Sequence, residues 1–93
     1  MIAHNFKIKF ASGVTQTEID GKHVLFSKET GDFFGLNDSA QMFLEELHDN
    51  DFTTTVRKVA ERFLVSEDEI STDLLVLLNG LEKPKLIHKI SVP

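Results

Sequence analysis

The chain of 93 residues contains no cysteine. This absence excludes disulfides, thiolate metal sites, a cysteine nucleophile and thiol redox chemistry, and it fits a cytoplasmic protein. No apolar run approaches the roughly 20 residues that cross a bilayer. Residues 1–5 also lack the charged start, apolar stretch and cleavage site of a secretory signal. We therefore expect a cytoplasmic protein that does not act at a membrane.

Common arrangements of catalytic, metal-binding and nucleotide-binding residues are also missing. His4, His23, His48 and His88 form no short pair at metal-ligand spacing. The five glycines are isolated rather than gathered in a phosphate-binding loop, and no Gly-x-Ser-x-Gly elbow occurs. We therefore predict no catalytic residue, no bound metal and no cofactor.

Positively charged residues are in deficit. The chain has 10 lysines and arginines against 15 acidic residues, with a net charge of −5. This balance opposes sequence-independent attraction to nucleic-acid phosphates, and a basic or neutral apolar partner suits the surface better. A chain of this length buries one modest core, so we expect a single domain over residues 1–93 without a separate catalytic domain.

Alternating apolar residues and turn signals predict strands in the first third of the chain. Residues 6–10 alternate strictly, as a half-buried strand or an extended arm does. Residues 14–19 and 23–26 flank Asp20-Gly21, a dipeptide that tolerates the positive φ of a tight hairpin turn. A further polar turn then leads to a third strand, which completes a small antiparallel meander.

The third strand, residues 33–36, is apolar on both faces. Period-two alternation places Phe34 and Leu36 on one face and Phe33 and Gly35 on the other. Packing on one core cannot satisfy both faces. We therefore expect Phe34 and Leu36 to meet the core, Phe33 to lie on the open face, and the strand edge to receive a peptide.

Two helices are expected next, each with an apolar stripe. Residues 37–39 are all good N-cap residues for a helix that runs to about His48, and a second helix begins near Thr53. The apolar stripes consist of Ala40, Phe43, Leu44 and Leu47 in the first helix and Val56, Val59, Ala60 and Phe63 in the second.

The third helix has the clearest start in the chain. Ser66 and Glu69 form a capping box, while Val65 and Ile70 can form a hydrophobic staple across it. Asn79-Gly80 or the later Pro84 should end the helix, and residues 86–92 form a final extended segment. Its stripe consists of Ile70, Leu74, Leu77, Leu78 and Leu81.

Leu75 and Val76 fall outside the stripe of the third helix. The C-terminal half of this helix is therefore apolar most of the way round, which indicates contact from two sides. A leucine-rich interior helix or a dimer contact would give the same pattern.

Several of these features occur together in one known family. They are the strand turn, the Glu-Thr-Gly-Asp-Phe-Phe-Gly-Leu-Asn segment at residues 29–37 and the three helix starts, in this order and at this spacing. The chain resembles the PqqD-like precursor-peptide recognition elements, most closely the stand-alone B1 proteins of lasso-peptide biosynthesis. The resemblance covers about residues 8–87. Residues 83–86 depart from the usual Lys-Gly-Leu-like helix exit of the family, which affects the expected shape of the C-terminal segment.

The resemblance implies an α+β, winged helix-turn-helix fold with an N-terminal three-stranded antiparallel sheet followed by three helices. It implies a non-catalytic adaptor that binds the leader segment of a ribosomally made precursor peptide. The leader would add as a strand to the third strand, against the third helix. The implied partners are the leader peptide, a transglutaminase-like leader peptidase and an asparagine-synthetase-like cyclase, or a radical SAM enzyme in a PqqD-type pathway.

Site residues carried over by position come from two elements. Gly35 would let a peptide backbone approach, although a bend or bulge explains a strand glycine equally well. Asp73 would pair with a basic leader residue or remain solvated, and Leu74 and Leu78 would be wholly structural if they face the core. The full set is Asp32, Phe33, Phe34, Gly35 and Leu36 from the strand, and Asp73, Leu74, Leu77, Leu78 and Leu81 from the helix.

Two other functions share this arrangement of elements. A DNA-binding winged helix would place the third helix in the major groove, but the exposed start of that helix would be the acidic run of residues 67–69. Those carboxylates oppose docking on phosphates and base edges. An enzyme subunit or structural partner that uses the apolar groove for protein contact remains the other alternative.

Overall fold

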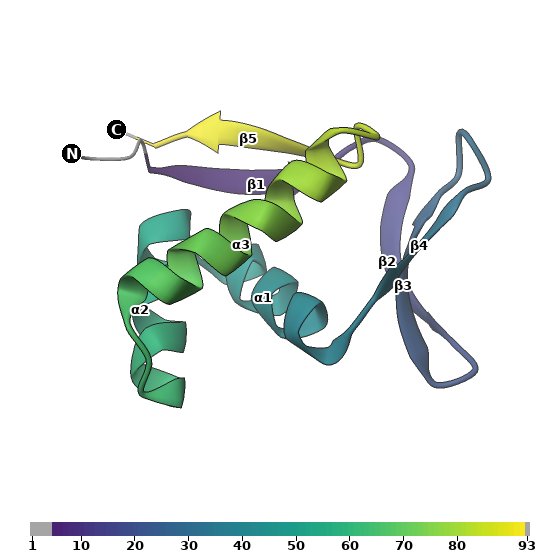
Figure 1. The fold of residues 1–93 in the computed structure, drawn as a ribbon. Coiled ribbons are helices and arrows are strands. Elements are labelled where there is room, and N and C mark those ends of the chain that lie inside the picture. Colours follow the sequence, from purple (N-terminus) through teal and green to yellow (C-terminus); the bar gives the residue numbers. More distant parts are fainter. Residues whose placement is uncertain (1–4, 93) are drawn as a thin grey trace.

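The computed structural model describes residues 5–92. Three earlier subjects lie wholly or mostly outside the described residues. They are His4, the segment of residues 1–5 that was compared with a secretory signal, and Pro93. The fold is α+β, as predicted (Figure 1). In chain order the elements are β1 (Phe6–Phe10), β2 (Val14–Ile19), β3 (Lys22–Ser27), β4 (Phe33–Leu36), α1 (Asp38–Asp49), α2 (Phe52–Phe63), α3 (Glu67–Glu82) and β5 (Ile87–Ser91).

The predicted meander is a three-stranded antiparallel sheet in the order β2-β3-β4. Asp20 and Gly21, with φ of 52° and 79°, form the tight turn between β2 and β3. The sheet projects to one side of the helices, and β4 leads directly into α1 (Figure 1). The three-stranded sheet and the three helices that follow it are confirmed.

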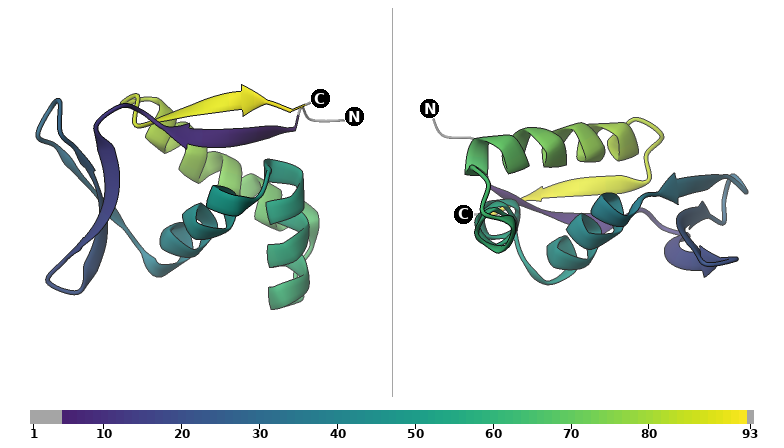
Figure 2. Two further views of the ribbon diagram at one scale, coloured as in Figure 1. Left: turned by 180° about the vertical axis from the view of Figure 1, so that it is seen from behind. Right: turned by 60° about the horizontal axis from the view of Figure 1, so that its bottom comes forward.

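A second sheet pairs the two ends of the chain. β1 and β5 are antiparallel, with Phe6 opposite Ser91 and Phe10 opposite Ile87. The views in Figure 2 show this ribbon alongside α3 and separate from the three-stranded sheet. Sequence patterns indicated both extended segments but not their pairing, because contacts between distant segments leave no local spacing signal.

All three helices begin at a polar N-cap residue; Asn37 and Ser66 were predicted as caps, whereas Asp51 was expected only to precede the second helix. The N-cap side chains of Asn37, Asp51 and Ser66 accept hydrogen bonds from backbone N–H groups three residues later, at 2.8, 2.8 and 3.1 Å. Each bond satisfies one of the donors that a helix start leaves free. The predicted starts are therefore confirmed to within one or two residues.

Of the two predicted stops for α3, the later Pro84 rather than Asn79-Gly80 agrees with the observed end. The helix continues through Gly80 to Glu82. Leu78 and Leu81, on either side of the glycine, are fully buried, so their packing holds the backbone helical. The chain then turns at Lys85, whose φ is 63°, and the Leu86 N–H donates to the Leu81 carbonyl at 3.0 Å.

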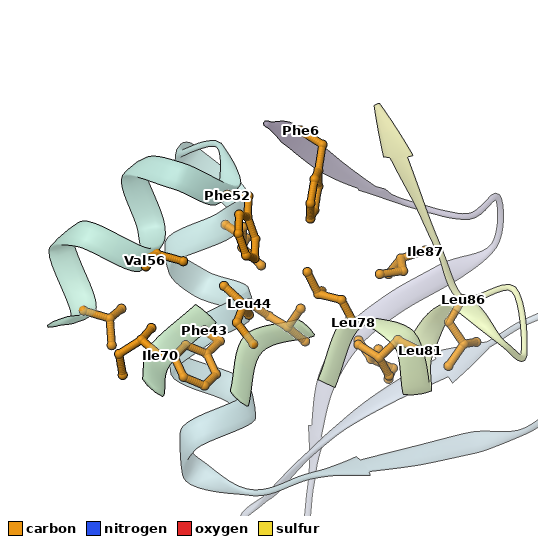
Figure 3. Packing of buried hydrophobic residues seen from close by; sticks show 14 of the residues in the cluster. Phe6, Phe43, Leu44, Phe52, Val56, Ile70, Leu78, Leu81, Leu86 and Ile87 are labelled. Carbon is orange, nitrogen blue, oxygen red and sulfur yellow. The ribbon is translucent and has the colours of Figure 1, made fainter. Parts of the chain in front are cut away.

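One hydrophobic core joins the helices to both sheets (Figure 3). Phe6 of β1 stacks on Phe52 of α2, with ring centroids 4.8 Å apart. Leu78 and Ile87 bring α3 and β5 into the same cluster, and Leu25 brings in β3. No helix within residues 5–92 has the length and apolar character needed to span a bilayer.

Candidate functional site

Within residues 5–92, β4 is paired on one side only, because it is the last strand in the order β2-β3-β4. Ser27 N–H donates to the Asp32 carbonyl at 2.9 Å, just before β4 begins. In an antiparallel ladder such bonded pairs alternate with non-bonded ones. The N–H and C=O groups of Phe33 and Gly35 therefore point away from β3, toward the free edge.

The two faces of β4 have different surroundings. Phe34 lies opposite the fully buried Leu25, on the side of the helices, whereas Phe33 lies opposite Phe26 on the outer face. The Phe26 and Phe33 ring centroids are 4.7 Å apart. The side chain of Phe33 is 57% exposed on the open face, where it was predicted to lie. Phe34 is also 39% exposed. Phe34 is thus on the core side but is not a core residue, while Leu36 packs against the core.

Gly35 causes neither a bulge nor a bend. It lies in regular register opposite Val24, and its φ is not positive. A Cβ built at this position would have no other atom within 4 Å. Neither the backbone geometry nor the packing of residues 5–92 requires glycine here.

A groove of about 550 Å³ begins at Asn37, where β4 ends, and runs between α1 and α3 to the turn after α2. This volume lies within the range of about 300–1,000 Å³ that ligand sites occupy. Most of the lining side chains are apolar. The lining residues are Asn37, Ser39, Ala40, Met42, Phe43, Val59, Phe63, Val65, Glu69, Ile70, Asp73, Val76 and Leu77.

The helix residues predicted for the site divide into two groups. Asp73 and Leu77 line the groove. Leu74, Leu78 and Leu81 are 0% exposed and belong to the core, so their assignment to a peptide surface is corrected. The predicted apolar stripe covers a wide part of the helix surface. Its centre faces the other core elements, whereas one of its sides faces the groove.

Several groove residues were not predicted as site residues. Phe63 and Val76 are 52% and 69% exposed and face the groove from α2 and α3. Val76 carried a signal, because it falls outside the apolar stripe of its helix. Phe63 carried no such signal, because its spacing matches the apolar stripe of α2. Its side chain is exposed because Phe63 is the last residue of that helix.

A second hollow, of about 920 Å³, lies on the other side of α1. Gln41, Leu44 and His48 face this hollow, whereas Ala40 and Phe43 face the groove beside β4. The other walls come from β1, β2 and the start of β3. No residue of β4 lines this hollow or the groove, but the groove lining includes Asn37, which directly follows β4.

The groove carries negative charge without compensation from its own walls. Glu69 and Asp73 are its only charged lining residues within the described part of the chain. Across residues 5–92, ion pairs join Lys58 to Glu46 and Lys89 to Glu82, and neither touches the groove. No group of three or more potential metal ligands occurs in the same range.

Comparison with known proteins identifies the family. The sequence profile described as "Coenzyme PQQ synthesis protein D (PqqD)" matches residues 22–87, which is more than half of the chain. The chain belongs to the PqqD family. The resemblance drawn from the sequence is therefore confirmed, while a search of curated proteins finds no matching relative.

Two solved structures share the PqqD-family fold of this chain. "TbiB1 in Complex with the TbiA(beta) Leader Peptide" aligns at a TM-score of 0.76 and 23% identity, over 86% of this chain and 94% of that one. "Lasso peptide synthetase B1 complexed with the leader peptide" aligns at a TM-score of 0.76 and 17% identity, over 94% of this chain and 99% of that one. Both of those proteins were solved with a leader peptide.

Proposed function

We propose that this PqqD-family protein is a non-catalytic adaptor that binds the leader segment of a ribosomally synthesised precursor peptide. The leader adds as a strand to β4 and places side chains in the groove beside α3. The observation that carries this proposal is the unpaired β4 edge, which opens at Asn37 onto an apolar groove. The fold shared with two proteins solved with leader peptides supports it.

Backbone bonds alone are too weak for this task. The free edge offers the N–H and C=O groups of Phe33 and Gly35, and each hydrogen bond contributes about 0.5–1.5 kcal/mol net. Ordering a disordered peptide costs about 2–5 kcal/mol, which is of the same size as the sum of those bonds. The surplus that gives useful affinity must come from side chains buried in the groove.

The groove can supply that surplus. Burying a Leu- or Phe-sized side chain contributes about 1.5–3 kcal/mol, and the walls expose Phe63, Val76 and Leu77 to receive it. Gly35 allows the leader backbone to lie close to β4, because no side chain stands at that position. The proposed contact residues are Asp32, Phe33, Phe34, Gly35, Leu36, Asp73 and Leu77.

Binding would promote processing by tethering. Holding the leader raises the effective concentration of the attached core peptide near a processing enzyme, without new chemistry. In a lasso-peptide pathway the enzymes are a transglutaminase-like leader peptidase and an asparagine-synthetase-like cyclase, acting in the cytoplasm.

A PqqD-type role as peptide chaperone for a radical SAM enzyme is the second candidate, because the matching profile is that of a coenzyme PQQ synthesis protein. Both roles use the same strand addition. Neighbouring reading frames separate them: a short precursor beside a peptidase and a cyclase supports the lasso pathway, whereas a radical enzyme supports the PqqD-type pathway.

The strand-addition test uses Gly35→Pro and Gly35→Ala, with a synthetic leader of the precursor encoded beside this protein's gene. Proline removes an N–H that points to the free edge and leaves the bonds between β3 and β4 intact, as edge strands tolerate. Calorimetry should show at least a tenfold loss of leader affinity for Gly35→Pro. Gly35→Ala keeps the N–H and has open space for its Cβ, so it should lose much less.

Amide hydrogen exchange gives an independent readout of the same bonds. Leader binding should slow exchange at Phe33 and Gly35, whose N–H groups face outward, more than at Phe34 and Leu36, whose N–H groups face β3. Equal affinity of the folded proline variant and the wild type, or protection confined to other elements, would refute strand addition to β4.

A further inference from the structure

Four residues of α3 that line the groove share one face of the helix. Glu69, Asp73, Val76 and Leu77 follow an i, i+4, i+7, i+8 spacing. The carboxylates lie toward the N-terminal half of the helix and the apolar side chains toward the C-terminal half. The residues of this α3 wall therefore pass from acidic to apolar along the helix, while Val65 and Ile70 add apolar lining near Glu69.

The two carboxylates have no cationic partner among residues 5–92. Arg62 lies beside the groove without lining it, and its guanidinium is placed 5.4 Å from the centroid of the Phe63 ring. Like charges at i, i+4 destabilise a helix by about 0.2–0.5 kcal/mol. The positive start of α3 compensates Glu69 in the first turn, but Asp73 lies beyond that turn.

The C-terminal part of this α3 wall is apolar and open. Val76 is 69% exposed and Leu77 is half-buried. Phe63, at the end of α2, is a further exposed apolar residue of the groove lining, at 52%. One wall thus offers both an apolar contact and an uncompensated negative charge.

We propose that this groove selects a leader segment that carries a lysine or arginine together with a large apolar side chain. The basic group lies near Glu69 and Asp73, and the apolar side chain packs on Val76 and Leu77. This inference rests on the proposed leader-binding function and adds the chemical class of side chain that the site recognises.

Charge complementarity decides between possible occupants. An acidic peptide or a nucleic acid would bring negative charge against Glu69 and Asp73, and a second copy of this chain docked groove to groove would bring the same carboxylates together. Each of these contacts would bring like charges together, which is repulsive. A basic and apolar peptide is the occupant whose charge opposes that of the walls.

The same helix provides a matched control. Glu67 and Asp68 lie within one turn of Glu69 and are exposed, but they do not line the groove. The test compares the double variant Glu69→Gln and Asp73→Asn with the control Glu67→Gln and Asp68→Asn. Both pairs remove two negative charges from α3, so general electrostatic attraction to the protein changes equally.

Calorimetry with the N-acetylated synthetic leader should show an affinity loss of about 3- to 10-fold for the groove pair at low salt, as expected for partly exposed ion pairs. The control pair should change affinity less than twofold. The difference should fall as salt rises to about 0.5 M, because screening weakens the ion pairs. Circular dichroism verifies that each variant is folded.

Leader peptides with each lysine or arginine changed to glutamine complete a double-mutant cycle. One such change should weaken binding to the wild type and have little further effect on the groove pair. Equal affinity of the groove pair and the wild type, or equal loss for groove and control pairs, would overturn the charge inference. If Gly35→Pro still weakens binding, leader capture stands; a wild type that binds no leader overturns both proposals.

Discussion

At the scale of single residues, Asp51 shows how one side chain fixes the start of a helix and its place in the fold. Its carboxylate accepts the Thr54 N–H at 2.8 Å. Beside it, the Asn5 side chain accepts the N–H of Thr53 and of Phe6, both at 3.0 Å, which ties β1 to the start of α2. The Thr54 N–H bond to the carboxylate lowers the pKa of Asp51 from its ordinary value of 3.8.

The first prediction concerns the pH dependence that follows from this lowered pKa. A carboxylate with a lower pKa in the folded chain stabilises the fold above its ordinary value, and this contribution is lost as the pH falls through the folded pKa. Asp51→Ala should lower the free energy of unfolding by about 1 kcal/mol near neutral pH. Asp51→Asn keeps a capping oxygen and should lose less.

Urea denaturation from neutral pH to about pH 3 measures this effect. The advantage of the wild type over Asp51→Asn should shrink as the pH falls below about 4. An advantage that stays constant over this range would show that the Asp51 charge does not contribute to stability.

At the scale of elements, α2 ends in an unusual way. Its C-cap, Leu64, adopts a left-handed conformation with φ of 56° and ψ of 44°, a position that glycine normally occupies. The Leu64 side chain is 90% exposed and gains almost nothing from packing. The short turn that follows brings Val65 into the groove and leads to the N-cap of α3.

We therefore predict that Leu64→Gly stabilises the protein by about 1 kcal/mol, because glycine adopts this backbone conformation without strain. Leu64→Ala keeps the strain and removes the same exposed surface, so it should leave stability nearly unchanged or lower. Thermal and urea unfolding of both variants measure the difference. A glycine variant no more stable than the alanine variant would show that the backbone strain at this position is negligible.

At the scale of the whole molecule, the β1–β5 ribbon links the two ends of the chain to the helices. Ile87 of β5 is 1% exposed and joins the core that also contains Leu78 and Phe6. Ile90 is on the same strand but is 48% exposed. Because β4 belongs to the other sheet, the ribbon supports the core without forming part of the peptide edge.

Ile87→Ala should accordingly lower the free energy of unfolding by about 2–5 kcal/mol, since it leaves a cavity in the core. Ile90→Ala makes the same chemical change at an exposed position and should cost less than about 1 kcal/mol. Urea denaturation provides both values. Similar losses for the two variants would mean that the ribbon does not pack into the core as described.

The sequence by itself determined the local elements of this protein. Capping side chains, the Asp20-Gly21 turn and apolar alternation act between residues a few positions apart, so the starts of α1, α2 and α3 and the meander could be predicted. The outward direction of Phe33 followed from alternation alone. The family was also within reach, because its motifs are local and ordered along the chain.

Only the tertiary structure decided which apolar residues are core and which are open. Leu74 and Leu77 belong to one predicted stripe, yet Leu74 is buried and Leu77 lines the groove, because the surrounding elements cover one side of the helix. The presence of Phe63 and Val76 in the lining of one groove and the pairing of β1 with β5 likewise depend on packing between distant segments. Spacing along a chain fixes which side chains share a face, but only packing fixes what that face meets.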